Sequence, residues 1–386
     1  MPAELPSQPV ADDDLRAARE AVQNARLLDS EDAVRKALEN RDPAHTVGID
    51  TEFVRERTFQ ARPGLIQISD GHSVWLLDAV ALPESAALGD MLAHSGTTKV
   101  LHSVGEDLDV LHAVGARWPE RLFDTQVAAA LLGMPLQLRY EHLVEATLGV
   151  ELEGGKARND WCRRPLAPAL LQYAAEDVIW LPRLKAHLEA LLESAGRLDW
   201  LEEDCERILE RGRAGDTTPA LTRVKGAGRL ETPALARLDA LAQWRETVAR
   251  ERDLPRRFVV SDEALVDLAQ SDNKGTLGQA LGRLPGKLSR RFGPAIEAEL
   301  TAVDPNAYQR PGWIDPLSPG QRDQLRELQQ TVKQVAADLG IEPAVIASKK
   351  ALTPLIRGER PEWLDGWRGH VLAGRLEAAS VSISAP

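Results

Sequence analysis

Two carboxylates two residues apart, Asp50 and Glu52, come at the end of the apolar run 47–49. Because successive side chains of a β-strand point to opposite faces, residues i and i+2 share a face, and both acids point the same way. Two acids on one buried face repel each other and are costly to desolvate unless a cation or water compensates them. The pair therefore suggests a divalent metal site, although 59 acidic residues in 386 leave a chance pair at an exposed strand end as the alternative.

Two later segments supply further acids and a phenol. Asp107 follows the strand-like run 99–101 at the start of a periodic helix, and α/β proteins present ligands at the carboxyl ends of strands. Tyr173 and Asp177 are four residues apart and share one helix face. Each has a plain alternative, because the helix dipole favours an acid at a helix N-terminus and Tyr173 could be a half-buried helix aromatic. Together, four acids from three segments suit a site for two Mg²⁺ or Mn²⁺ ions that catalyses phosphoryl transfer.

Four strings resemble the exonuclease motifs of the ribonuclease D family, within the DEDD group of 3′-to-5′ exonucleases. They are GIDTEF at 48–53, LHSVGEDL at 101–108, FDTQ at 123–126 and YAAED at 173–177. In that group the last motif carries either His five residues before its Asp or Tyr four before it. Gln172 and Tyr173 give this chain the tyrosine form. The resemblance, over about residues 45–195, implies that Asp50, Glu52, Asp107 and Asp177 hold two metal ions and that Tyr173 positions the attacking water.

The same resemblance implies an activity. We expect a metal-dependent 3′-to-5′ exoribonuclease that trims structured RNAs with single-stranded 3′ ends, such as tRNA precursors, and releases nucleoside 5′-monophosphates. The acids do not distinguish the sugars, so a DNA-directed exonuclease stays open. A catalytically degenerate protein that only binds RNA is the other alternative, and the presence of all five catalytic-type residues argues against it.

Candidate substrate contacts lie around these motifs. Phe53 could stack on the terminal base or pack in the core. The segment 156–166, KARNDWCRRPL, has Asn159 where the family commonly has Ser, and it could contact phosphates or be an ordinary solvated loop. Asp124 is expected to cap a helix over 124–132. The predicted substrate-binding residues are Phe53, His102, Lys156, Trp161, Arg164, Arg256 and Arg257.

The elements that position these residues are of two kinds. After a linker at 212–220 every periodic segment is helical, which indicates an α/β domain followed by all-α material. The resemblance specifies a ribonuclease H-like exonuclease domain with a mixed sheet. Strands are expected near 46–52, 64–69, 73–78, 98–102 and 121–123, and helices near 84–94, 107–115, 124–132, 140–148 and 168–194.

The helical part contains an internal repeat. At an offset of 87 residues, nine apolar positions of one copy fall on apolar positions of the other, including Leu241 on Leu328. The first copy resembles the HRDC domain, a nucleic-acid-binding helical module, whereas the second keeps mainly the apolar frame and could be a structural spacer. The predicted domains are a helical lead-in over 1–40 with a helix over about 13–40, the exonuclease domain over 41–212, and HRDC-like domains over 228–303 and 316–381.

Charge and composition limit the partners. A formal charge of −12 argues against indiscriminate binding of polyanions, so nucleic acid must bind at local basic patches. Residues 205–230 and 275–293 are candidates, the second without an acid, although such a run is usually a solvated face. No apolar run approaches the roughly 18 residues of a membrane-spanning helix, and no secretion signal is recognisable. Cys162 and Cys205 lack metal or redox spacing, which suggests a reducing compartment, and we expect a cytoplasmic protein. We also expect it to be a monomer.

Overall fold

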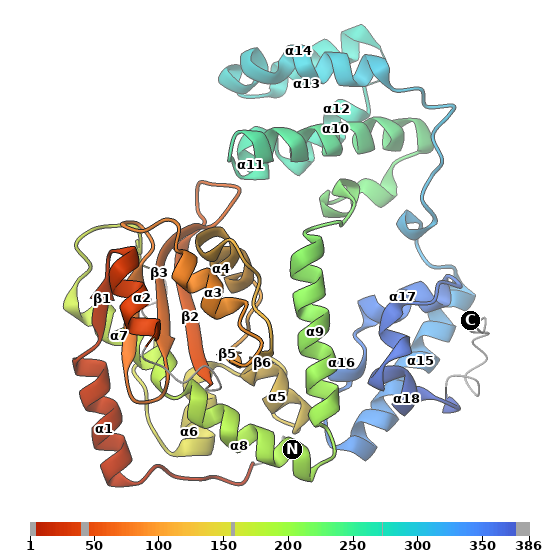
Figure 1. Ribbon diagram of the computed structural model, residues 1–386. Coiled ribbons are helices and arrows are strands. Elements are labelled where there is room, and N and C mark those ends of the chain that lie inside the picture. The colour runs from red at the N-terminus through yellow and green to blue at the C-terminus, as the bar shows by residue number, and fades with distance from the viewer. Residues whose placement is uncertain (1–4, 40–45, 156–158, 272, 376–386) are drawn as a thin grey trace. The chain divides into compact units, whose positions relative to one another are not determined.

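The computed structural model describes residues 5–39, 46–155, 159–271 and 273–375 (Figure 1). Contacts divide the chain into two compact units. The first contains residues 1–54, 62–215 and 323–386, and the second contains residues 55–61 and 216–322. The second helical repeat therefore belongs largely to the same unit as the α/β part. Within the described ranges, no helix is long and apolar enough to cross a membrane.

A six-stranded mixed sheet in the order β1-β4-β3-β2-β5-β6 organises the first unit. At its centre, β2 (Val47–Val54) pairs antiparallel with β3 (Arg62–Ser69), and β3 pairs antiparallel with β4 (Val74–Asp78). On the far side of β2, β5 (Lys99–Leu101) and β6 (Leu122–Asp124) follow in parallel pairing. The predicted α/β domain with a mixed sheet is confirmed.

The expectation of one helix over about 13–40 is wrong. α1 (Asp12–Gln23) ends before a short strand, β1 (Arg26–Leu28), and α2 (Glu31–Glu39) follows. β1 pairs parallel with β4 and completes that edge of the sheet, where unpaired backbone groups would otherwise remain. Three residues are too few to show the alternation that identifies a strand, so only pairing with the distant β4 reveals β1.

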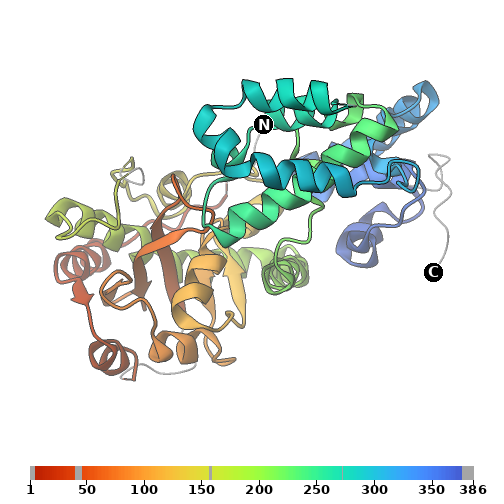
Figure 2. The ribbon, with the colours of Figure 1, turned by 90° about the horizontal axis from the view of Figure 1, so that it is seen from above.

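Helices lie on both faces of the sheet, as Figure 2 shows. Gly48 marks the face of β2 that α7 (Pro168–Ile179) and α8 (Leu181–Ser194) approach, because a Cβ there would lie 2.7 Å from the Cβ of Leu181. α4 (Asp107–Gly115) packs against β2 and β3 and contacts Thr51, whose side chain points to the opposite face. The remaining helices of the α/β part are α3 (Ala86–Leu92), α5 (Thr125–Leu131), α6 (Tyr140–Leu148) and α9 (Leu198–Ala214).

The predicted helix over 168–194 is two helices, with the break at Trp180. Pro182 lies at the start of α8 and lacks the N–H that would continue the hydrogen bonds of α7. The break lets α8 leave at a new angle, while α7 keeps its last turns against the sheet. It therefore separates the helix that carries Tyr173 and Asp177 from the helix that covers β5 and α5.

The predicted repeat is confirmed in three dimensions. In the second unit, α10 (Thr232–Glu251), α11 (Arg256–Val259) and α12 (Asp262–Ala269) precede α13 (Lys274–Arg283) and α14 (Gly286–Ala302). α15 (Pro319–Leu339), α16 (Pro343–Ile346) and α17 (Lys349–Ile356) repeat the first three helices at the same offset, and α18 (Trp367–Leu372) follows. Ser261 and Ser348 are equivalent N-caps, each accepting a hydrogen bond from the backbone N–H three residues on.

The second repeat packs against α9 in the first unit. Trp200 and Trp367 stack with ring centroids 4.4 Å apart and an interplanar angle of 5°. Arg368 Nη2 donates to Asp204 Oδ2 at 2.9 Å, and Trp367 Nε1 donates to Asp204 Oδ1 at 3.2 Å. Because Asp204 is buried, this pairing is costly to break. These contacts favour the structural alternative for the second copy.

Candidate active site

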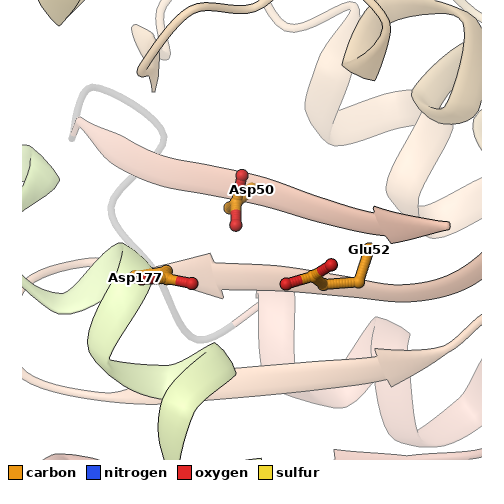
Figure 3. Close-up of side chains that lie close together, drawn as sticks. All are labelled: Asp50, Glu52 and Asp177. Atoms are coloured by element: carbon orange, nitrogen blue, oxygen red, sulfur yellow. The ribbon is translucent and has the colours of Figure 1, made fainter. Parts of the chain in front are cut away.

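Three of the predicted acids form one cluster. Carboxylate oxygens of Asp50 and Glu52, on β2, and of Asp177, on α7, all lie within 4.8 Å of one another (Figure 3). The alternation of the strand puts the first two on one face, and α7 packs against that face and brings the third. Carboxylates gathered in this way are the hard oxygen donors that Mg²⁺ and Mn²⁺ prefer.

Burial raises the pKa of each acid in the cluster, and repulsion from neighbouring carboxylates adds to the shift. Burial, followed by the charges of Asp107, Asp177 and Glu52, holds the pKa of Asp50 well above its usual value. Burial, with repulsion from Asp177 and Asp107, raises the pKa of Glu52 to about 9. Burial also raises the pKa of Asp177 to about 7, against the opposing hydrogen bond from Tyr173. A bound divalent cation would compensate this repulsion and favour the charged carboxylates, so the donor set fits a metal ion.

Asp107, the fourth predicted acid, lies beside this cluster and outside it. It begins α4, and its Oδ1 accepts a hydrogen bond of 2.5 Å from the hydroxyl of Thr51. Burial raises the pKa of Asp107 to about 6, and the Thr51 hydroxyl opposes that shift. Its charge contributes to the raised pKa of Asp50 and Glu52. Asp107 therefore acts on the cluster electrostatically without sharing its tight oxygen set.

Asp124 holds the loop that leads into α4. Its carboxylate accepts hydrogen bonds from the backbone N–H groups of Ser103 and Val104 at 3.1 and 2.9 Å. The same carboxylate caps α5 by accepting from Gln126 and Val127, which confirms the predicted N-cap. One buried acid thus holds both the loop before α4 and the N-terminus of α5.

Tyr173 lies one helical turn before Asp177 and hydrogen-bonds to its carboxylate. Burial, with the nearby charges of Asp177 and Glu52, raises the pKa of the Tyr173 phenol above its usual value. The hydroxyl therefore stays protonated and can donate a hydrogen bond. Its ring lies 6.2 Å from that of Trp161, centroid to centroid. This environment suits a group that orients a water molecule more than one that removes its proton.

A cavity of about 380 Å³ opens beside the acids. Half-buried Phe53 lies on its wall, at a point where the β2–β3 register shifts between Glu52 and Phe53. Such irregularities re-aim side chains at active sites. The volume falls within the range of small-ligand pockets, and Phe53 offers a ring inside it. The lining comprises Asp50, Thr51, Glu52, Phe53, His102, Tyr140, Glu141, Tyr173, Asp177 and Leu181.

The structure corrects the predictions for Trp161 and Arg164. Trp161 is fully buried, with 0% of its surface exposed. Its backbone lies so close to β3 that a Cβ on Gly64 would be 2.7 Å from the Trp161 carbonyl oxygen. Arg164 is bound by Asp78, with Nε donating to Oδ2 at 2.6 Å and Nη2 donating to Oδ1, and it also donates to the backbone carbonyls of Trp161, Arg163 and Gly64. Neither side chain is available to RNA phosphates. Lys156 lies outside the described residues.

His102 reaches the cavity wall, but both of its ring nitrogens are engaged. Nε2 lies 2.9 Å from the Leu138 carbonyl oxygen and must donate to it, and Nδ1 lies 2.9 Å from Thr125 Oγ1. Burial leads the effects that lower the pKa of His102. These bonds give His102 a role in holding α5 and the loop before α6, and its contact with substrate stays a prediction.

The two arginines of the second unit that were predicted to bind substrate differ in their contacts and exposure. Arg256 is bound by Glu246 through two hydrogen bonds of 2.5 and 2.6 Å, and its guanidinium lies 4.8 Å from the ring centroid of Phe59. Arg257 is exposed and lies over the ring of Phe258, 42% of which is exposed. The prediction that Arg256 binds substrate is therefore corrected, because Arg256 is an internal partner of Glu246. Arg257 remains open to nucleic acid.

The basic stretch 275–293 contains no acidic residue, but an acidic residue of α12 pairs with it. Arg283 donates to both oxygens of Asp267, at 2.7 and 2.8 Å. Lys287, Arg290 and Arg291 are exposed on α14. The basic surface available there is therefore smaller than the sequence indicates.

Two residues near the acids were absent from the predictions. Gln67 lies opposite Asp50 in the β2–β3 register, is fully buried, and its Nε2 lies 3.4 Å from Asp50 Oδ2. An amide inside the apolar run 65–68 was a signal that the sequence contained. Tyr140 lines the cavity from the first turn of α6, and its hydroxyl donates to the Glu176 carbonyl at 3.3 Å. Its position becomes visible only once α6 and α7 are packed.

Comparison with known proteins matches both parts of the chain. Residues 25–193 match the family model of a 3′-5′ exonuclease, and residues 234–300 match that of the HRDC domain. Ribonuclease D of Shewanella sp. (strain ANA-3) is 37% identical over 345 residues, which cover 86% of this chain and 88% of the relative. Ribonuclease D of Escherichia coli (strain K12) is 32% identical over 368 residues, covering 92% and 97%.

A solved structure is similar over nearly the same length. The crystal structure of Escherichia coli RNase D, described as an exoribonuclease involved in structured RNA processing, aligns with a TM-score of 0.83 at 30% identity. The alignment covers 92% of this chain and 98% of that structure. The likeness therefore includes the helical parts as well as the α/β part.

Proposed function

Because this chain belongs to the ribonuclease D family and is a 3′-to-5′ exoribonuclease, we propose that Asp50, Glu52 and Asp177 hold its divalent metal. The observation that supports this proposal is that carboxylate oxygens of the three residues lie within 4.8 Å of one another, beside a cavity of about 380 Å³. We propose two ions, Mg²⁺ or Mn²⁺, with Asp107 supporting the second. When bound, such ions provide Lewis-acid stabilisation of the attacking and leaving oxygens in phosphodiester hydrolysis.

The protein's own side chains position the reactants. The protonated Tyr173 hydroxyl, held by Asp177, orients the attacking water toward the scissile phosphate. Phe53, on the cavity wall, stacks on the terminal base. Attack by water on the last phosphodiester bond releases a nucleoside 5′-monophosphate and leaves a new 3′ hydroxyl on the shortened chain.

The substrate we propose is structured RNA with a single-stranded 3′ end, tRNA precursors in particular. The first HRDC domain, over 228–303, contributes electrostatic contacts through exposed Arg257 and the basic residues of α14. The second copy, over 316–381, stabilises the catalytic unit through α9. We expect a monomer that acts in the cytoplasm, where free thiols such as Cys162 and Cys205 persist.

A nuclease assay on matched 5′-labelled RNA and DNA oligonucleotides, with and without EDTA, tests this proposal. We expect stepwise shortening of the RNA from its 3′ end that stops with EDTA and returns with Mg²⁺ or Mn²⁺. Asp50→Asn removes a charge from the cluster and should lower turnover by several orders of magnitude while RNA affinity remains. Asp109→Asn changes an exposed acid on α4 and is the matched control. Wild-type rates for Asp50→Asn at saturating metal would exclude the site, and faster shortening of DNA would favour the DNA-directed alternative.

A further inference from the structure

We propose that Thr51, the residue between the two strand acids, is a positioning residue whose hydroxyl holds the Asp107 carboxylate in its working orientation. The inference rests on the proposed metal-dependent function of the neighbouring acids. It assigns a role to the middle residue of the Asp-Thr-Glu string, which the acid chemistry leaves unused. It also explains how an acid outside the tight cluster is kept beside it.

The geometry of β2 carries this inference. Thr51 alternates with Asp50 and Glu52, so its side chain points to the face covered by α4 while theirs point toward α7. Thr51 is only 6% exposed, and its backbone is paired with Ile66 of β3. A buried hydroxyl needs a partner, and that of Thr51 donates to Asp107 Oδ1 at 2.5 Å. The strand therefore sets two acids directly and reaches the third through a hydrogen bond.

Within α4, the Asp107 carboxylate hydrogen-bonds to its own backbone N–H, and Thr51 adds a partner from the strand that carries the other two acids. Asp107 is the first residue of α4, and Glu106 before it makes no side-chain cap. The backbone of the loop is held by Asp124 through Ser103 and Val104, but those bonds do not reach the Asp107 side chain. A β-branched threonine on a strand has a restricted χ1, so its hydroxyl points in a defined direction. The Thr51 hydroxyl thus ties one carboxylate oxygen of Asp107 to β2.

The experiment compares variants that separate the hydroxyl from the shape of the side chain. Thr51→Val keeps the branched shape and the strand preference but removes the donor, whereas Thr51→Ser keeps the donor. Thr147→Val is the control, because Thr147 is fully buried and its hydroxyl donates to the Leu143 carbonyl within α6. Asp107→Asn and the double variant Thr51→Val with Asp107→Asn complete a cycle. The readouts are kcat and KM on labelled RNA, Mn²⁺ binding by titration calorimetry, and the unfolding temperature.

Partners that orient metal-site residues typically contribute about 10- to 100-fold to activity or metal affinity. We expect Thr51→Val to lose that much in kcat or in Mn²⁺ affinity, Thr51→Ser to regain most of it, and Thr147→Val to match the wild type. The double variant should be no worse than Asp107→Asn, because Thr51 acts through Asp107. Wild-type kcat and Mn²⁺ binding in Thr51→Val would overturn the inference, as would a Ser variant as defective as the Val variant, or additive losses. If Asp107→Asn itself were fully active, the proposed metal function of Asp107 would fail first.

Discussion

Replacing Arg164 by Met distinguishes a structural arginine from a phosphate-binding one. All of its described hydrogen bonds are internal: two to Asp78, and the others to backbone carbonyls that include those of Trp161 and Gly64. Methionine keeps much of the aliphatic length but leaves the Asp78 carboxylate with only the backbone N–H groups of Val80 and Ala81. The variant should therefore lose stability.

The size of the loss follows from the burial of the pair. Removing one partner of a buried ion pair costs about 3–5 kcal/mol. Side-chain exposure is 6% for Asp78 and 24% for Arg164, so solvent screening on the arginine side favours the lower end, about 3 kcal/mol. At about 2–4 °C per kcal/mol for a unit of this size, the first unit should melt roughly 6–12 °C lower. Arg163→Met, which changes the exposed neighbour, should melt as the wild type does.

The loss should also depend on pH. Burial alone would raise the pKa of Asp78, but hydrogen bonds from Arg164 and the backbone lower it below the usual value. A carboxyl with a lowered folded-state pKa contributes stability above its unfolded pKa, about 3.9, and loses it as the pH falls through the folded value. The gap between wild type and Arg164→Met should thus be constant near neutral pH and narrow below about pH 4.

Thermal unfolding followed by circular dichroism and RNA binding over a salt series check both sides of this reasoning. We expect the melting temperature to fall while the slope of log affinity against log salt stays that of the wild type. A variant that melts normally but binds RNA more weakly, with a slope reduced by about 0.7 for the lost phosphate contact, would refute the internal role of Arg164.

Three further variants test other parts of the structure. Tyr173→Phe keeps the ring beside Trp161 and should lower kcat by about 10²- to 10⁴-fold with an unchanged melting temperature; full activity in the folded variant would leave Tyr173 a packing residue. Trp367→Ala removes the stack on α9 and should cost the first unit about 3–5 kcal/mol in chemical denaturation, whereas a small loss would mean that the second repeat does not stabilise the catalytic unit. Arg257→Glu should reduce the salt slope of RNA binding without changing dinucleotide turnover, and an unchanged slope would remove Arg257 from the RNA surface.

The catalytic set was predictable because its geometry is local. Residues two apart on a strand share a face, and residues four apart on a helix share a turn, so Asp50 with Glu52 and Tyr173 with Asp177 pair on backbone periodicity alone. The helical repeat was predictable for a similar reason, since equivalent apolar positions recur at a constant offset in both copies. The mixed sheet came from the resemblance of these motifs to a known family.

Which charged residues are free depends on contacts between segments that are distant in the sequence. Arg164 and Arg256 read as phosphate contacts in their own segments, but Asp78 and Glu246 come from other elements and bind them. β1 likewise exists because β4 offers it an edge. Which side chains share a face of a strand or helix follows from the amino-acid sequence alone, because it depends only on the repeat of the backbone. Which distant partner satisfies a buried charge, hydroxyl or strand edge depends on packing between segments, and the link from Thr51 to Asp107 is of that kind.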